Sequence, residues 1–272
     1  MKFNKKLLAF AIAAGLSAFS TTSSAIVFPD FQVQEGVVPG SAGNLFTGDK
    51  ITGNYVEVVT FGAGTFDVSI KWQAGQFIGN NGVDPVNTQL GAPTILNVGY
   101  GLYGLYQASG TFTSGLSTTF NFNPGGSLSL FVDALQDTAL TAPALGSSPW
   151  TTANNADDLL IGTGVPVSGA GLLDPSLSTC TTTGTGTINC GSFGTTSSFA
   201  LTAFGATYFV SPVPFYNVVF NSGQLNNFTV SGTQTINGSL DAVFGTNVPE
   251  PASLALIGVG LLGFGLRRFN KV

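Results

Sequence analysis

Two pairs of closely spaced aspartates are the first candidates for chemistry in this sequence. Asp133 and Asp137 occur in FVDALQDTAL, and Asp157 and Asp158 occur in NNADD. A glycosidase needs two carboxyl groups that face each other across a substrate. Asp157 and Asp158 are adjacent, so on a strand they would face opposite sides. Asp133 and Asp137 straddle an expected strand end and could converge. The alternative is that all four are solvated acids at loop ends.

The same acids raise the question of a metal. Asp157 and Asp158 could hold calcium through carboxylate and carbonyl oxygens, although no EF-hand or repeat-type calcium spacing is present. The chain has no histidine and only two cysteines, so a zinc site lacks ligands. We therefore expect no resident metal or other cofactor, and keep calcium at this pair as a weak hypothesis that calorimetric titration would test.

The absence of histidine also removes the Ser-His-Asp and Cys-His arrangements of hydrolases. We assign no catalytic residues and expect that the protein is not an enzyme. An extracellular hydrolase is the least favoured alternative. Turnover of a polysaccharide that is abolished by Asp133→Asn or Asp158→Asn would support it.

Aromatic side chains are the most suggestive feature for a ligand. In GYGLYGLYQ, Tyr100 and Tyr106 would share one face of a strand and Tyr103 would take the other, beside glycines that leave the rings uncovered. Trp150 lies in SSPWTT, on an expected loop. These four rings could stack on sugars as a carbohydrate-binding module. The alternative is ordinary sheet packing with hydroxyl groups reaching water.

Charge is distributed unevenly along the chain. The body, residues 26–249, carries twelve acids against Lys50 and Lys71, a net charge of −10. A surface of that sign repels nucleic acid, so we expect no nucleic-acid partner. The body is rich in Gly, Thr, Ser, Asn and Phe, which suit strands and turns better than long helices.

Alternating apolar and polar residues predict several strands. In TFDVSIKW the apolar side chains occupy every second position, and KITGNYVEVVTF is the expected partner across a turn at 62–64. We predict two further tight turns, at 123–126 and at Asn237-Gly238. The expected fold is a single all-β domain, an antiparallel β-sandwich or jelly roll, with an N-terminal signal helix and a short C-terminal hydrophobic helix.

The two cysteines, Cys180 and Cys190, lie in TCTTTGTGTINCG. In an exported chain a disulfide is the default pairing. A reactive thiol or a metal pair is the alternative, and the metal pair lacks further ligands.

The N-terminus predicts export. Lys2, Lys5 and Lys6 precede a short apolar run, and Ser23-Ser24-Ala25 supplies the small residues that signal peptidase needs. We predict a signal peptide at 1–25, with cleavage between Ala25 and Ile26, because the apolar run is short for a bilayer span.

The C-terminus combines three elements. Pro249-Glu250-Pro251 is followed by an apolar run at 252–266 and by a basic cluster, Arg267, Arg268 and Lys271. The run is shorter than the ~20 residues that span a bilayer, and the basic cluster acts as a stop-transfer element that stays cytoplasmic. A weak permanent anchor is one interpretation; a tail made to be removed is the other. The predicted organisation is 1–25 signal peptide, 26–244 ectodomain, 245–248 linker and 249–272 sorting signal.

The tail resembles the PEP-CTERM sorting signal of Gram-negative bacteria. The resemblance implies processing by an exosortase, a membrane cysteine protease, after transient insertion in the inner membrane. It also implies a species that makes exopolysaccharide.

The body is similar to flocculation-associated PEP-CTERM proteins in the segments KITGNYVEVVTF, GTFDVSIKWQAGQF, GYGLYGLYQASGT, INCGSFGTT and SGQLNNFTVSGTQTINGSLDAVF. That resemblance implies a matrix or cell-surface protein that promotes cell aggregation together with exopolysaccharide. It carries over no catalytic residues, and maps only Pro249, Glu250 and Pro251 onto a motif with an assigned role.

Overall fold

The described chain is almost entirely β-structure. The computed structural model describes residues 28–86, 94–180, 189–223 and 225–245. The helices that lie wholly within these ranges are the 3-10 turn η1 (Glu35–Val37) and α2 (Gly205–Tyr208). The predicted all-β single domain is confirmed. The expected helices at both termini lie outside the described residues.

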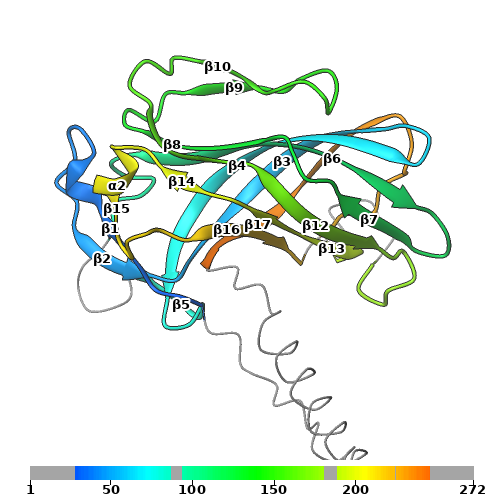
Figure 1. The fold of residues 1–272 in the computed structure, drawn as a ribbon, viewed down its shortest axis with the longest axis horizontal. Helices are drawn as coiled ribbons and strands as arrows, with labels where there is room; N and C mark the ends of the chain where they lie inside the picture. Colours follow the sequence, from blue (N-terminus) through cyan, green and yellow to red (C-terminus); the bar gives the residue numbers. More distant parts are fainter. Residues whose placement is uncertain (1–27, 87–93, 181–188, 224, 246–272) are drawn as a thin grey trace, which may run out of the picture.

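The main sheet closes on itself (Figure 1). Its strands are antiparallel, and those that form the closed ring follow one another around it in chain order. The ring contains β3 (Lys50–Phe61), β4 (Thr65–Gly79), β6 (Gly101–Thr113), β7 (Thr118–Phe122), β12 (Pro166–Leu173), β13 (Gly191–Ser197), β16 (Asn217–Ser222) and β17 (Thr233–Gly245). Pairing of β17 with β3 joins the last strand to the first, and pairing of β4 with β6 completes the ring. A sandwich would have two separate sheets that face each other. Here each strand of the ring pairs on both edges, so the two sheets are joined into one.

Three ring strands are prolonged by a second segment. β8 (Ser127–Asp133) follows β7 along the same edge of β6, and β11 (Leu159–Gly164) precedes β12. β14 (Ala200–Leu201) follows β13, and pairs with β11. The short β5 (Asp84–Pro85) pairs with the end of β4.

The turn predicted at 123–126 is wrong. β7 and β8 both run antiparallel to β6, so the chain from 118 to 133 continues in one direction across this segment. Gly125 and Gly126 take positive φ values of 108° and 100°, which glycine adopts at little cost. A side chain at Gly126 would collide with the carbonyl oxygen of Gln107. The glycines therefore allow a break between β7 and β8 in which the backbone packs closely against β6. The sequence had suggested a hairpin turn at this position.

The hairpin predicted at Asn237-Gly238 is also wrong. β17 is unbroken from Thr233 to Gly245, and Asn237 and Gly238 pair with Val56 and Tyr55 of β3. Continuous pairing with β3, from Thr233 to Val243, outweighs the local turn preference of this dipeptide. The turn at 62–64 between β3 and β4 is confirmed.

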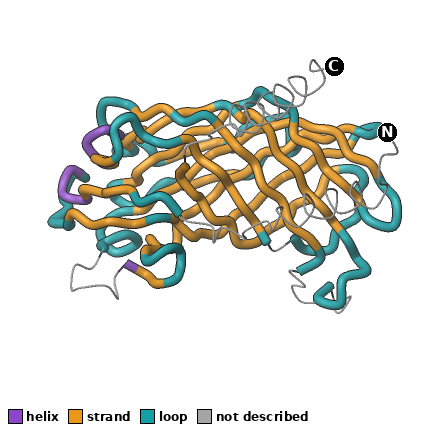
Figure 2. Tube along the Cα trace, turned by 60° about the horizontal axis from the view of Figure 1, so that its bottom comes forward, coloured by secondary structure: helices purple, strands orange, loops and turns teal. Residues whose placement is uncertain are grey.

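Two small sheets complete the fold. β1 (Phe31–Gln34) pairs with β2 (Leu45–Gly48) and with β15 (Phe209–Ser211), close to η1 and α2. β9 (Ala139–Thr141) pairs with β10 (Thr151–Ala153) and lies above the main sheet (Figure 1). Figure 2 shows the strands crossing the molecule obliquely, with loops gathered at its two ends.

The two ends differ in what they carry. We call one end of the closed sheet proximal. It is the end where β17 finishes, and Gly245 lies there beside Pro29. The end with the 62–64 turn is distal, since Thr60 pairs with Thr233 at the start of β17. Inward side chains of the ring form an aromatic-rich core between the two ends.

Candidate functional site

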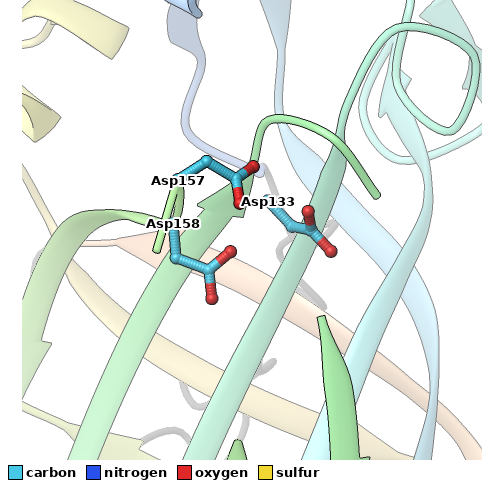
Figure 3. A group of neighbouring side chains, drawn as sticks. All are labelled: Asp133, Asp157 and Asp158. Carbon is cyan, nitrogen blue, oxygen red and sulfur yellow. The ribbon is translucent and has the colours of Figure 1, made fainter. Parts of the chain in front are cut away.

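The predicted acids converge in part at the ends of two neighbouring strands. Asp133 is the last residue of β8, and Asp157 and Asp158 directly precede β11. β8 and β11 pair antiparallel, with Val132 opposite Leu159. One carboxylate oxygen from each aspartate therefore lies within 4.8 Å of the others (Figure 3).

Each carboxylate of this acidic cluster already accepts hydrogen bonds. Asp158 accepts from the hydroxyl groups of Tyr103 and Thr138, the latter at 2.8 Å. Asp157 accepts from the Leu135 backbone N–H at 2.8 Å. Asp133 accepts from the N–H groups of Asp137 and Thr138. Asp137 contributes its backbone N–H rather than its carboxylate, so the structure groups Asp133 with Asp157 and Asp158 and not with the Asp137 carboxyl group.

Burial and like charge both disfavour ionisation here. Burial is the largest influence on Asp158 and raises the pKa of its carboxyl group. The hydrogen bonds from Tyr103 and Thr138 lower that pKa, and the charges of Asp133 and Asp157 raise it. A hard cation would relieve this repulsion. The donor set is three carboxylates, whereas calcium takes six to eight oxygens, so calcium at Asp157 and Asp158 stays a hypothesis.

The proposed sugar-stacking rings are all buried, which corrects that interpretation. Tyr100 is 0% exposed, Tyr103 4%, Tyr106 5% and Trp150 7%. A ring must present a face to solvent to stack on a sugar, and packing within the protein accounts for these rings instead.

Their contacts show what the rings do. The Tyr103 ring stacks on Phe131 with centroids 5.0 Å apart, and Tyr106 packs edge-on against Phe220 inside the ring of strands. The Trp150 indole N–H donates to the Ser69 carbonyl at 3.1 Å, which fastens the 134–158 segment to β4. The structure thus favours the packing alternative for all of them.

The predicted disulfide is present between Cys180 and Cys190, with an S–S distance of 2.03 Å. It lies at the distal end, because Cys190 immediately precedes β13. The Cys190 N–H donates to the carbonyl of Leu225 at 2.8 Å. The crosslink therefore ties the start of β13 to the segment that follows β12, and backbone hydrogen bonds join the start of β13 to the segment that follows β16.

Sequence reasoning missed two buried glutamates. Glu35 in η1 is 0% exposed, and Glu57 in β3 is 9% exposed. Glu57 could have been found, because the alternation of β3 places it on the same face as Tyr55 and Val59. Nothing local in the sequence marks Glu35, whose partners lie far along the chain.

The C-terminal tail matches a known sorting motif. The family model for the PEP-CTERM protein-sorting motif matches residues 247–268. The chain carries a PEP-CTERM sorting motif. Searches of curated proteins and of solved structures found no match to the chain.

The PEP-CTERM motif begins two residues after β17 ends at Gly245. It implies export, passage through a membrane-anchored form and processing by an exosortase. Several predicted features lie outside the described residues: the cleavage site at Ala25 and Ile26, Pro249-Glu250-Pro251, and the basic cluster Arg267, Arg268 and Lys271. Within the ranges that the structure describes, neither helix has the length and apolar character needed to cross a membrane.

Proposed function

We propose that this PEP-CTERM protein is a non-enzymatic matrix component that promotes flocculation in association with exopolysaccharide, after an exosortase has processed its tail. The motif at 247–268 is the observation that carries the proposal. In this proposal the N-terminal signal directs export and the tail holds the body at the inner membrane until it is processed. The resemblance of the body to flocculation-associated proteins supplies the narrower role.

The outer face of the closed sheet supports an association with polysaccharide. Register places Asn221, Asp241 and Thr52 side by side across three strands, on the outward face. Asn54 and Ser239 form the next row along the strands. Hydroxyl and amide groups at strand spacing suit hydrogen bonds to sugar hydroxyl groups. With a body charge of −10, a neutral or cationic polymer is favoured over an anionic one.

The non-enzymatic part of the proposal follows from the chemistry that the residues offer. The chain has no histidine, and the converging acids among the described residues are engaged by hydroxyl and backbone donors. Their arrangement is better suited to holding the start of the loop after β8 against the start of β11 than to transferring a proton to a substrate.

The experiment replaces Pro249, Glu250 and Pro251 by alanine in the producing cells. Intact mass and C-terminal peptide mapping of the matrix protein are measured together with floc sedimentation. We expect the native chain to end near 249–251 and the variant to keep its tail and flocculate poorly. The Thr246→Ala variant, just outside the motif, is the matched control. Normal flocculation in cells that lack the protein entirely would refute the matrix role, and a native chain still ending at Val272 would refute processing.

A further inference from the structure

The distal end contains a cavity with an unusual lining. The cavity is about 30 Å³ in volume. Its wall is largely aromatic and includes six phenylalanines: Phe61, Phe66, Phe120, Phe122, Phe193 and Phe228. The one ionisable side chain in the lining is Glu57. A carboxyl group thus faces a small space that is otherwise apolar.

Glu57 has no counter-ion within the described chain. Its cross-strand neighbours are Ile70 and Ile236, and no described residue forms a hydrogen bond or ion pair with its carboxyl group. The two lysines of the body are engaged elsewhere. Lys50 pairs with Asp241 at 2.9 Å, and Lys71 lies over the Trp150 ring. Burial of a carboxyl group without partners is costly, so a ligand that supplies the missing charge would be bound favourably.

We propose that this cavity binds a small organic cation, a primary ammonium group of methylammonium size, with Glu57 as its counter-ion and the phenylalanine rings as its walls.

The chemistry of the lining selects this class of ligand. An anion would meet an acidic body and a carboxyl group. A divalent metal needs about six oxygen ligands, and the lining offers one carboxylate. A neutral apolar molecule would leave the carboxyl group unpaired. An ammonium group gains a charge-assisted hydrogen bond from Glu57 and cation–π contact with aromatic faces. The volume restricts the occupant to a few heavy atoms.

Proton release gives the proposal a second signature. Burial raises the pKa of Glu57 to about 8, so the carboxyl group is mostly protonated at neutral pH. The titratable groups that respond to the charge of Glu57 are the hydroxyl groups of Tyr55 and Tyr106, whose pKa values it raises. An ammonium ion binds the ionised form, so binding near pH 7 releases roughly one proton, and affinity at pH 9 is roughly tenfold higher than at pH 7.

The test is calorimetric titration of the purified full chain with methylammonium chloride, with sodium chloride at equal ionic strength as reference. Titrations at pH 7 and pH 9, in two buffers of different ionisation enthalpy, report affinity and proton release. We expect saturable binding that tightens roughly tenfold at pH 9. Glu57→Gln should abolish it, whereas Asp67→Asn, which changes net charge equally outside the cavity, should not.

A second variant guards against misfolding of Glu57→Gln. Val68→Ile keeps the branched shape of a lining residue, retains Glu57 and fills part of the cavity, so it should weaken binding at least severalfold. Lack of saturable binding by the native chain, or equal binding by the native chain and Glu57→Gln, would overturn the proposal. Binding that Val68→Ile leaves unchanged would place the ligand elsewhere and also overturn it.

Discussion

Glu35 and Glu57 are buried glutamates toward opposite ends of one closed sheet, and their surroundings differ completely. Glu35 accepts hydrogen bonds from Tyr100 at 3.0 Å, from the Ile95 N–H at 3.1 Å and from Thr94. The Asn44 N–H approaches it at 3.5 Å. Glu57 faces an apolar cavity without a hydrogen-bond donor among the described residues.

The difference shows what burial of an acid requires. At the proximal end, donors from several separate segments converge on one carboxylate and hold η1 against the start of β6. At the distal end the same side chain type is enclosed by phenylalanines, and burial raises its pKa to about 8. One acid contributes to the fold, whereas the other is a cost that the fold tolerates.

Replacing Glu35 should have the largest effect, because it tests directly whether the hydrogen bonds to this carboxylate stabilise the fold. Glu35→Ala leaves the Tyr100 hydroxyl and the Ile95 N–H without their buried acceptor, so the free energy of unfolding should fall by about 3–5 kcal/mol. Chemical denaturation at pH 7 measures it, with Asp67→Ala as the control expected to change by less than about 0.5 kcal/mol. A small loss for Glu35→Ala would mean that the network is not needed for stability.

Glu57 should affect stability through pH. Because its folded pKa is raised, the folded state holds a proton that the unfolded state releases between the ordinary value near 4.5 and about 8. Stability should therefore be highest below this window and fall by about 1 kcal/mol per pH unit as pH rises through it. Glu57→Gln has no carboxyl group to ionise at this position, so its free energy of unfolding should lack this decline with pH. Parallel curves for both proteins, from denaturation between pH 5 and pH 8, would contradict a buried, unpaired acid.

The sequence predicted local features well and convergent ones poorly. The hairpin of β3 and β4 follows from strict alternation and a glycine turn, both visible within thirty residues. Alternation also marks the inward face of β7 and β8, where Phe120, Leu128, Leu130 and Val132 are buried. Whether the segment between them turns depends on β6, which pairs with both.

The candidate site shows the same limit. Asp133 and Asp158 were recognised as candidates, but their proximity depends on β8 and β11 being neighbours. The donors to Glu35 include Tyr100, which lies 65 residues away along the chain. Tyr100 itself appeared available for a sugar because the flanking glycines say nothing about what covers the ring. Periodicity gives the face of a strand, whereas only the closed fold gives what packs on that face.

The hydrogen-bond network around Glu35 can be tested with a smaller change at Tyr208, which is hydrogen-bonded to Glu35 through Tyr100. The Tyr208 hydroxyl lies 2.6 Å from that of Tyr100, which still reaches Glu35 if Tyr208 is lost. Tyr208→Phe should therefore lower the free energy of unfolding by about 1 kcal/mol. Tyr216→Phe removes an exposed bond to the Asp30 carbonyl and should cost less. Thermal unfolding of both variants compares them, and equal losses would show that burial adds nothing to the Tyr208 bond.

The acidic cluster should lie between the two glutamates in behaviour, because it is partly exposed and partly satisfied. Burial and the neighbouring carboxylates raise the pKa of Asp158 above 3.8, so the folded state binds its proton more tightly than the unfolded state. Stability therefore falls as pH rises from about 3.8 through the raised pKa, and Asp158→Asn removes this decline. Because solvent screens these partly exposed charges, Asp158→Asn should gain only a few tenths of a kcal/mol in free energy of unfolding. Denaturation curves between pH 4 and pH 7 measure it, with Asp137→Asn as the control. A loss of stability in Asp158→Asn would show that the bonds from Tyr103 and Thr138 outweigh the repulsion, and would place the cluster with Glu35 rather than with Glu57.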